Sequence, residues 1–435
     1  MPGVTDDTIT VVYYWKGERT QTSPYLPPGM RDAVDEAEAF RRLVAYINAN
    51  ADGGATFMGF PFDLHGRTIE GIVLDPGGTD PAQYAALAEM IAHEIRPAVA
   101  IAAHGSISAY VCPTLAENGI HNLAVLDLDF GLAERTDGYC TPNGPSFDKQ
   151  VELSVGYLAD QAATSQYSGP EAPTGPEDRV YGFLYTEYPG LVDSAPIIIE
   201  QLRASGVNIP DDAVATLSPS LATAQQQAPN VVAKFRNAGV NTVIMPDAGA
   251  PLNFTHAAQP SFHPDYFVWP CAGMDTPGMA RLFDPTQWER ASGLTCYDQE
   301  FNPDLTHGDE ARKTEWYAQY REGGGGAEAP SPTALVYATL LPFPVGMTYA
   351  GEDPTIEGFR TGMDAFEPYR YDAIEGPTTD ETNLLLGFQE SDRSLFVDVA
   401  EIEWSNTARR DSGALQGAYV YLNDRARFGS AEEFS

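Results

Sequence analysis

The segment 40–105 constrains the fold more than any other part of the chain, because helical and extended patterns alternate along it. Residues 40–47 carry apolar side chains at i, i+3, i+4 and i+7, the spacing of an amphipathic helix. Residues 69–73 alternate as in a strand, and 80–97 start with an aspartate and a proline and end at a proline, as a helix does. The apolar run 98–103 is typical of a strand buried on both faces of a parallel sheet. An α/β lobe is therefore predicted.

The tract 165–178 is rich in Gly, Pro and Ser, and a second series of strands and helices follows it. In this series we expect strands over 179–189, 212–218, 240–249 and 266–273, with helices between them. Residues 136–147 read as a turn-rich bridge between the two series. Further on we expect helices over 309–323, 332–347 and 353–366, and strands over 388–404 and 417–422. Two doubly wound parallel-sheet lobes are the predicted architecture.

The composition excludes several classes of partner. The 435 residues are enough for two lobes of ordinary domain size. Asp and Glu number 61 against 25 Lys and Arg, a net charge of −36 that repels phosphate backbones and anionic lipids. We therefore expect no nucleic acid and no membrane surface as partner, and we interpret the acidity as a solvated exterior.

Four cysteines fall into two pairs with similar gaps, one pair in each predicted lobe: Cys112 with Cys140, and Cys271 with Cys296. This spacing favours two local disulfides, although three pairings of four cysteines are open. Zinc ligation is the competing interpretation, and no CxxC supports it. Disulfides imply an oxidising, extracytoplasmic compartment.

The chain resembles the type I periplasmic solute-binding proteins of the branched-chain amino acid (Leu/Ile/Val) class. The resemblance rests on the order of elements, with residues 45–48, Gly66 and Arg67, Asp75 and Val99 where they stand, and on a start, 3–14, that looks like the first mature segment and strand. It implies a type I periplasmic-binding fold with about three hinge crossovers. Lobe 1 would comprise 1–147 and about 300–375, and lobe 2 would comprise 148–299 and about 376–435.

The resemblance also implies a function. We expect a monomeric, extracytoplasmic protein, with any signal or lipid anchor removed, that closes around a small molecule and delivers it to the permease of an ABC importer. A sensory domain of the same fold is the alternative among binding modules, and a hydrolase-like α/β enzyme is the alternative from another class. No GxSxG, P-loop or GxGxxG is present, so we expect no catalysis and no cofactor.

Ligand contacts are expected at the carboxyl ends of the strands. In lobe 1 the first such tip holds His104, Gly105, Ser106 and Ser108, which match the family loop that holds a ligand carboxylate. The same serines also suit N-caps. The second tip holds Asp127 and Asp129, which could meet an ammonium or hydroxyl or cap the local turn.

In lobe 2 the resemblance places Tyr188 where the family has a ligand-facing tyrosine, and Asp247 at the end of another strand. Family members that bind amino acids have an acid in the next loop, where this chain has Cys271 and, displaced by about two residues, Asp275. We therefore expect an aromatic or largely apolar ligand in preference to a free branched-chain amino acid.

Two further groups of residues complete the candidates. Trp15 and its neighbours could roof the site, although aromatic residues at strand ends also build cores. Two histidine pairs are close in sequence, but neither spacing fits a zinc motif, so we expect no metal: His256 with His263, and His104 with His121.

Overall fold

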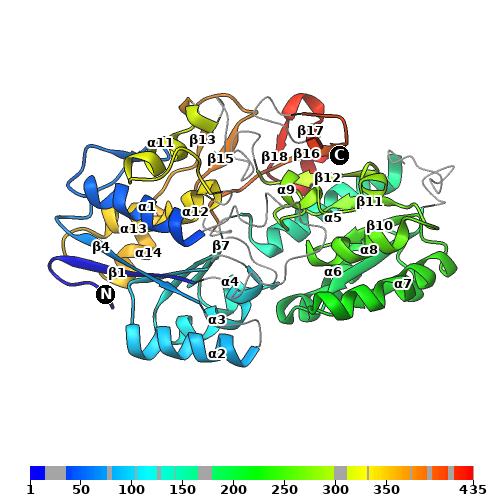
Figure 1. Ribbon diagram of the computed structural model, residues 1–435, viewed down its shortest axis with the longest axis horizontal. Coiled ribbons are helices and arrows are strands. Elements are labelled where there is room, and N and C mark those ends of the chain that lie inside the picture. The colour runs from blue at the N-terminus through cyan, green and yellow to red at the C-terminus, as the bar shows by residue number, and fades with distance from the viewer. Residues whose placement is uncertain are drawn as a thin grey trace.

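A computed structural model describes most of the chain. The described residues are 1–14, 36–75, 81–102, 105–124, 129–142, 144–164, 179–297, 311–330, 333–372, 375–388, 394–409 and 416–434. Three of the predicted site residues, Trp15, His104 and Asp127, lie outside these ranges. Two large sheets, each covered by helices, form the two halves of the molecule, and we call these halves lobe 1 and lobe 2 (Figure 1).

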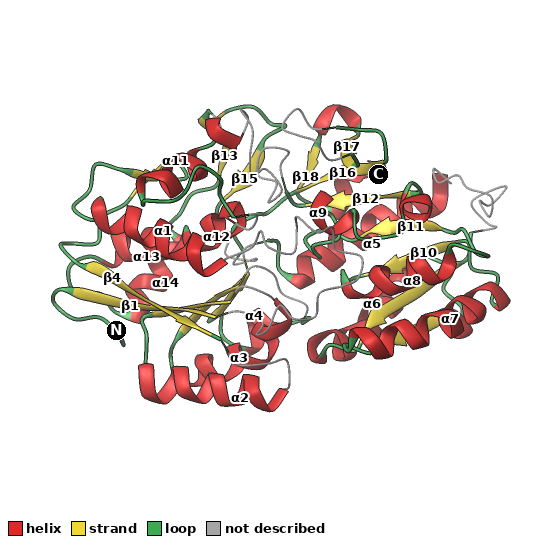
Figure 2. Ribbon diagram, in the orientation of Figure 1, coloured by secondary structure: helices red, strands yellow, loops and turns green. Residues whose placement is uncertain are grey.

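Lobe 1 is built on a parallel sheet with strand order β4-β1-β5-β6-β7. Its strands are β1 (Thr8–Tyr14), β4 (Thr68–Leu74), β5 (Val99–Ala102), β6 (His121–Ala124) and β7 (Cys140–Pro142). Its first helices are α1 (Glu36–Ala49), α2 (Pro81–Glu89, continued by a π-helical turn Met90–Ile95), α3 (Gly105–Glu117) and α4 (Leu132–Arg135). Helices α2 and α3 lie on one side of the sheet and α1 lies on the other (Figure 2).

The predicted segment 40–105 is thus the helix-strand-helix-strand unit of lobe 1. Alternate residues of β1 face opposite layers: Tyr13 stacks on Phe40 of α1 at 4.9 Å between ring centroids, and Tyr14 joins the core beneath α2 and α3. Gly71 lets α1 approach β4 closely, because a Cβ there would lie 2.9 Å from the Phe40 ring. The sequence pattern therefore corresponds to real packing on both faces of the sheet.

Lobe 2 is built on the sheet with strand order β17-β16-β12-β11-β10-β8-β9, and β18 pairs with β16. Its strands are β8 (Tyr181–Thr186), β9 (Val214–Leu217), β10 (Thr242–Met245), β11 (Asp265–Val268), β12 (Ala291–Thr295), β16 (Val399–Ser405), β17 (Ala418–Tyr421) and β18 (Arg427–Phe428). Its helices are α5 (Phe147–Thr164), α6 (Pro189–Ala204), α7 (Leu221–Asn237), α8 (Gly249–Ala258), α9 (Pro277–Ala280) and α10 (Pro285–Trp288).

The register of this sheet shows that helices cover both of its faces. Phe183, Ile244 and Phe267 are registered neighbours in adjacent strands, so they share one face, and Tyr157 of α5 stacks on Phe267 there. Gly182 points to the other face, where its Cβ would lie 2.9 Å from Phe235 of α7. Lobe 2 is therefore doubly wound, as the repeated strand-helix pattern predicted.

The third section of the chain returns to lobe 1. It forms helices α11 (Glu315–Glu322), α12 (Thr333–Leu340), α13 (Pro342–Ala350) and α14 (Ile356–Asp364). A three-stranded antiparallel sheet follows, with order β14-β13-β15: β13 (Tyr369–Asp372), β14 (Gly376–Thr378) and β15 (Leu384–Leu386). Its Tyr369 hydroxyl donates to the Met58 carbonyl at 2.6 Å, beside the hairpin of β2 (Thr56–Phe57) and β3 (Phe60–Pro61).

Among the described residues, one stretch, Thr333–Ala350, is long and apolar enough to cross a membrane by length and composition. It spans α12 and α13, and 78% of it is buried inside the protein. Its apolar side chains therefore pack as core.

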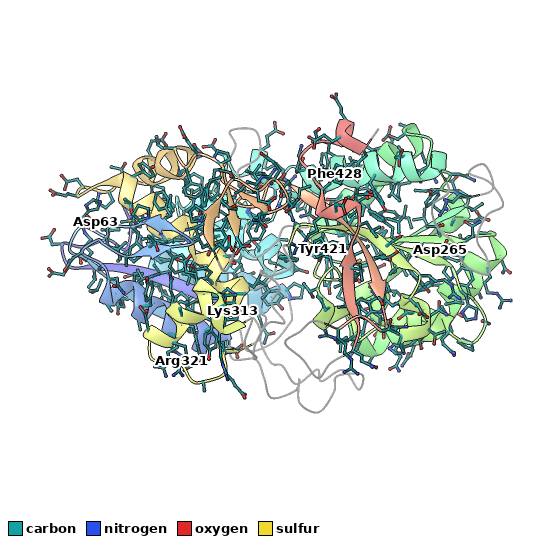
Figure 3. The ribbon with its side chains drawn as sticks, turned by 90° about the horizontal axis from the view of Figure 1, so that it is seen from above. Asp63, Asp265, Lys313, Arg321, Tyr421 and Phe428 are labelled. Carbon is teal, nitrogen blue, oxygen red and sulfur yellow. A yellow bond between two sulfur atoms is a disulfide. The ribbon has the colours of Figure 1, made fainter. Side chains whose placement is uncertain are left out.

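Three passages connect the lobes. The first lies between β7 and α5, the second after β12, and the third between β15 and β16. The resemblance implies a return to lobe 2 at about residue 376, whereas β15 pairs with β13 on the lobe 1 side, which places the third passage after β15. The view from above places Tyr421 and Phe428 toward the boundary between the lobes, with Asp63 and Asp265 in the bodies of lobe 1 and lobe 2 (Figure 3).

Candidate functional site

The carboxyl ends of β8 and β10 in lobe 2 are joined by Asp247. Its carboxylate accepts hydrogen bonds from the Thr186 N–H at 2.8 Å and hydroxyl at 2.7 Å, and from the N–H groups of Gly249 at 2.8 Å and Ala250 at 3.0 Å. Burial raises the pKa of Asp247, and these donors oppose the rise. The carboxylate proposed for ligand contact is thus bound to the protein's own donors, and it positions the residues around it.

Tyr188 lies beside this corner, at the N-cap of α6. A Cβ on Gly249 would lie only 3.1 Å from the Tyr188 hydroxyl oxygen, so the glycine leaves room for the phenol. Burial raises the pKa of Tyr188, and the Asp247 carboxylate and the hydroxyls of Tyr84 and Tyr110 raise it further. Since Tyr84 and Tyr110 belong to α2 and α3, the Tyr188 phenol of lobe 2 lies near lobe 1.

Tyr84 and Tyr110 form the lobe 1 side of this group. Their ring centroids are 5.3 Å apart, and Tyr84 is 3% exposed. Within the described part of the chain, the Tyr84 hydroxyl has no hydrogen-bond partner. Burial raises the pKa of Tyr84 to about 12, so the hydroxyl keeps its proton and can donate. Three tyrosines from both lobes therefore gather at one place, which we call the tyrosine cluster (Tyr84, Tyr110 and Tyr188).

The described residues of the first predicted tip of lobe 1 stand at the start of α3. Gly105 and Ser106 begin α3, directly after β5. Ser108 is 2% exposed and accepts a hydrogen bond from the Asn122 amide at 3.0 Å, and the Tyr14 hydroxyl donates to the same amide's oxygen at 2.6 Å. Ser108 thus ties α3 to β1 and β6. Of the two hydroxyl residues, Ser106 is the one at the tip.

The second predicted tip follows β6. Its Asp129 forms an ion pair with Arg135 at 2.5 Å. Arg135 also donates to the Phe130 carbonyl at 2.6 Å, so it holds the loop from both sides. The Asp129 carboxylate is therefore engaged with a cation of its own loop.

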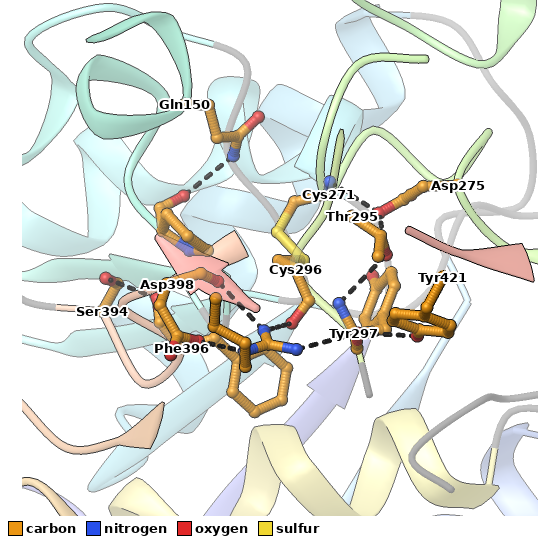
Figure 4. The surroundings of a disulfide bond; sticks show 12 residues. Gln150, Cys271, Asp275, Thr295, Cys296, Tyr297, Ser394, Phe396, Asp398 and Tyr421 are labelled. Atoms are coloured by element: carbon orange, nitrogen blue, oxygen red, sulfur yellow. Dashed lines mark hydrogen bonds and ion pairs between the residues drawn. A yellow bond between two sulfur atoms is a disulfide. The ribbon is translucent and has the colours of Figure 1, made fainter. Parts of the chain in front are cut away.

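The two disulfides join Cys112 to Cys140 within lobe 1 and Cys271 to Cys296 within lobe 2, the local pairing that the spacing favours. Figure 4 shows the surroundings of the second disulfide, with Tyr297 and Asp398 among the residues drawn around it. A Cβ on Gly144, in the first passage, would lie 2.5 Å from Cys271 Sγ. In the second passage, the Cys296 and Tyr297 carbonyls accept hydrogen bonds from Arg427 at 3.2 and 3.4 Å. We call this region the hinge node.

Asp398, at the end of the third passage, completes the hinge node. Its carboxylate pairs with Arg427 at 2.7 Å and also with Arg370 of β13. Arg370 belongs to the small sheet on lobe 1, whereas Arg427 belongs to β18 of lobe 2. One buried carboxylate therefore connects the two halves of the molecule.

Cys271 and Asp275, both predicted as ligand contacts, belong to this hinge node. Asp275 accepts a hydrogen bond from the Cys271 N–H at 2.9 Å and another from the Thr295 hydroxyl at 3.0 Å. Burial raises the pKa of Asp275 to about 6. Figure 4 shows Asp275 and Thr295 directed toward each other beside the disulfide. These contacts give Asp275 a structural role. Asp275 stands about two residues from the position at which the family has its acid.

No group of three or more His, Cys, Asp and Glu in the described ranges could hold a metal ion. His256 contacts the Leu282 carbonyl at 3.0 Å, and His263 contacts the Gln287 amide at 2.7 Å. His121 contacts the Thr141 hydroxyl at 2.9 Å. These histidines therefore take part in hydrogen bonds within their own lobes.

A model of the periplasmic binding proteins matches residues 29–384, most of the chain. The chain belongs to the periplasmic binding protein family. It is therefore a solute-binding protein, and the predicted family and the predicted type of fold are both confirmed. No curated relative matches its sequence.

Solved structures show the same fold as this binding protein at low identity. A solute-binding protein of an ABC transporter from R. palustris, in complex with 4-hydroxybenzoate, has 14% identity and a TM-score of 0.62, with 98% of each chain covered. One from Rhodopseudomonas palustris BisB5, with 3,4-dihydroxybenzoic acid, has 14% identity, a TM-score of 0.61 and the same coverage. One from Desulfitobacterium hafniense, with Leu, has 14% identity and a TM-score of 0.56, and covers 96% of this chain and 100% of its own.

Sequence reasoning missed Tyr84 and Tyr110. Both stand on helices at positions that also read as core, and Tyr84 does pack in the core beneath α2 and α3. The available signal was their place soon after the strand ends, in the early turns of α2 and α3. The sequence around Tyr84 and Tyr110 does not indicate that Tyr188 of the other lobe lies nearby.

Proposed function

We propose that this protein is the substrate-binding component of an ABC importer and that its ligand is a small aromatic carboxylic acid. The tyrosine cluster carries the proposal, because phenol side chains from both lobes meet at the carboxyl ends of the strands. Aromatic rings suit a planar apolar ligand, and their hydroxyls supply directional hydrogen bonds. Two of the similar solved structures hold hydroxylated benzoic acids, which supports this class.

The hydrogen bonds of Asp247 in lobe 2 favour a ligand without an ammonium group. Asp247 accepts four hydrogen bonds from the protein through both of its oxygens, whereas both bonds to Asp275 reach Oδ2, and its Oδ1 has no partner among the described residues. A carboxylate already surrounded by donors has little remaining capacity to neutralise a buried ammonium. An α-amino acid would therefore leave its positive charge poorly compensated at Asp247.

Closure of the lobes, without bond chemistry, is the proposed mechanism. A ligand that contacts both lobes binds the closed arrangement more tightly than the open one, and so shifts the equilibrium toward closure. A membrane permease would then recognise the closed protein. We further propose an extracytoplasmic location, which the family and the two disulfides support, and a monomeric state, which light scattering on the purified protein would test.

A thermal-shift and calorimetry series with 4-hydroxybenzoate, 3,4-dihydroxybenzoate, benzoate and leucine tests the ligand class. We expect the aromatic acids to raise the melting temperature by mass action and leucine to leave it unchanged. Stabilisation by leucine alone would overturn the proposed class. Native mass spectrometry of gently purified protein provides an independent search for a retained molecule.

Variants of Tyr188 test the site. Tyr188→Ala should weaken binding of the best aromatic acid by about 10-fold or more, as expected for a central aromatic contact, while the far-ultraviolet circular dichroism stays unchanged. Tyr188→Phe isolates the hydroxyl from the ring. The matched control is Tyr349→Ala, because Tyr349 is 51% exposed on α13. Equal affinities for Tyr188→Ala and the control would remove Tyr188 from the site.

A further inference from the structure

Two consecutive backbone amides of lobe 1 donate to side chains of lobe 2. The Phe130 N–H donates to the Ser194 hydroxyl at 2.8 Å, and the Gly131 N–H donates to the Asp148 carboxylate at 2.8 Å. Phe130 and Gly131 precede α4, whereas Asp148 stands in the first turn of α5 and Ser194 in the body of α6. One lobe 1 loop is thus hydrogen-bonded to two lobe 2 helices.

On the lobe 2 side, contacts within lobe 2 orient the Ser194 hydroxyl. The Ser194 hydroxyl donates to the Gly190 carbonyl one turn earlier at 2.7 Å, so its proton is committed and its lone pairs accept. Ser194 is 1% exposed. Asp148 is also partly buried, and burial raises the pKa of its carboxyl. In this arrangement the Ser194 hydroxyl is shielded from water, and the Asp148 carboxylate is partly shielded.

The lobe 1 side is equally well ordered. Arg135 binds the Asp129 carboxylate and the Phe130 carbonyl together, which fixes the backbone on both sides of the donating amide. Gly131 has φ +75°, in the left-handed region that glycine adopts without strain, and it forms the N-cap of α4. The two N–H groups consequently point the same way, out of their lobe.

We propose that these four residues form a clasp, Phe130 and Gly131 with Ser194 and Asp148, which stabilises the closed arrangement of the lobes before any ligand binds. This inference deepens the proposed function, because it assigns part of the closure energy to contacts between the protein's own lobes. A hydrogen bond of this kind contributes a factor of about 5 to an equilibrium constant, so the pair shifts the closed-to-open ratio by about 25-fold. Ser194 and Asp148 are positioning residues that need not contact the ligand.

The tyrosine cluster fits the same arrangement. Tyr84 of α2 and Tyr110 of α3 lie near Tyr188 at the start of α6, and their hydroxyls add to the rise that burial gives the pKa of Tyr188. Ser194 lies in the second turn of that helix, after Tyr188 at its N-cap. The clasp therefore holds α6 at the position in which Tyr188 reaches the other two phenols.

Distances between spin labels in the ligand-free protein test the clasp. All four native cysteines are in disulfides, so labels attach only to the introduced thiols of Glu89→Cys on α2 and Glu200→Cys on α6, both exposed positions. We expect Ser194→Ala to raise the ratio of the long-distance to the short-distance population by about 5-fold, and Asp148→Ala to do the same. The double variant should give about 25-fold.

Two variants serve as matched controls. Asp148→Asn keeps an oxygen that can accept from Gly131 but removes the charge, and Ser205→Ala changes an exposed serine at the C-cap of the same helix α6. Ser205→Ala should retain the wild-type distribution of distances, and Asp148→Asn should shift it less than Asp148→Ala does, because the amide oxygen is a weaker acceptor than the carboxylate. An unchanged distribution in Ser194→Ala would overturn the clasp, and an equal shift in Asp148→Asn and Asp148→Ala would overturn the Asp148 bond.

The measurement needs no ligand, so its outcome is independent of the proposed ligand class. Ser194→Ala places alanine, the best helix former, inside a helix, and thus favours a folded variant. Circular dichroism and thermal melting of each variant establish that it folds. Affinity for the aromatic acids can also be measured in Ser194→Ala. A weaker affinity at an unchanged melting temperature would indicate an effect on closure and not a general loss of stability.

Discussion

Arg427 and Asp398 form an ion pair at 2.7 Å in which each side chain is 1% exposed. Breaking such a pair leaves an uncompensated buried charge, which typically costs about 3 to 5 kcal/mol. Because Arg370 also pairs with Asp398, we expect Arg427→Met to lower the free energy of unfolding by about 3 kcal/mol. Urea denaturation of the wild type and the variant measures this difference in the free energy of unfolding.

The exposed pair of Arg203 with Asp211 is the control for that prediction, since its side chains are 39% and 97% exposed. Arg203→Met should change the stability by less than about 1 kcal/mol. Equal effects of the two substitutions on stability would show that the buried ion pair of Arg427 does not stabilise the hinge node.

The raised pKa of Asp275 predicts a pH dependence of stability. Its pKa is about 6 in the folded protein, above the ordinary value of 3.8, so between these values the folded state binds more protons than the unfolded state. The contribution of Asp275 to stability is therefore greatest below pH 4 and falls as the pH rises through 6, by about 3 kcal/mol in total. Asp275→Asn should abolish this component.

Unfolding free energies of the wild type and Asp275→Asn between pH 4 and 8 measure the effect. Other carboxylates titrate in both proteins, so the difference between the two curves is the relevant quantity. A constant difference across this range would contradict the assignment to Asp275.

The two disulfides should differ in function although they are similar in stability. They close loops of 28 and 25 residues, so in the chain-entropy model the loss of either one lowers stability by about 3 to 4 kcal/mol. We expect the double substitution of Cys271 and Cys296 by Ser to alter the distribution of distances between lobes as well, because this bond lies in the hinge node. The equivalent change at Cys112 and Cys140 should leave that distribution unchanged. Identical behaviour of the two variants would refute this distinction.

Gly144 provides a steric test of the same region. Its added Cβ would meet Cys271 Sγ at 2.5 Å, and a disulfide sulfur cannot move aside as the end of a flexible side chain can. Gly144→Ala should therefore destabilise the protein by about 1 to 3 kcal/mol through overpacking. For Gly326→Ala we expect almost no change, since the nearest atom to its Cβ would be 3.7 Å away. Thermal melting compares the two, and a tolerated Gly144→Ala would argue against close packing of the first passage.

Long periodic segments were predictable from the sequence, and short strands were not. The helix at 40–47 and the apolar strand at 98–103 were found because their periods reflect burial on defined faces. Residues 136–147 read as a turn-rich bridge, yet β7 lies within them and pairs Asn122 with Cys140 at the edge of the sheet. With three residues and a proline, such a strand carries too little pattern to be recognised.

Strand β12 was missed for a different reason. It lies inside the lobe 2 sheet, between β11 and β16, but its sequence, Ala291 to Thr295, contains a single β-branched residue, Thr295. Gly293 is needed there, because its Cβ would lie 2.4 Å from the Val268 carbonyl oxygen of the neighbouring strand. A requirement for close backbone approach is invisible until the neighbouring strand is known.

At the candidate site, too, the sequence indicated some features and not others. Tyr188 was expected from the family resemblance and lies between the lobes, and that resemblance also indicated the strand ends. Asp247, Ser108 and Asp275 were expected to face a ligand, but each accepts hydrogen bonds from the protein itself. A polar residue at a strand end can serve either role, and only its neighbours in space decide which.

The two chain ends belong to different lobes. The amino group of Met1 donates to the Pro354 carbonyl in lobe 1 at 3.2 Å, and Ala431, near the other end, packs where a Cβ on Gly156 of α5 would lie, in lobe 2. Figure 1 shows the two ends in different halves of the molecule. Fluorescent proteins fused to the two ends would convert lobe motion into a change in energy transfer, and the chain is therefore suited to become a genetically encoded sensor for whatever molecule it binds.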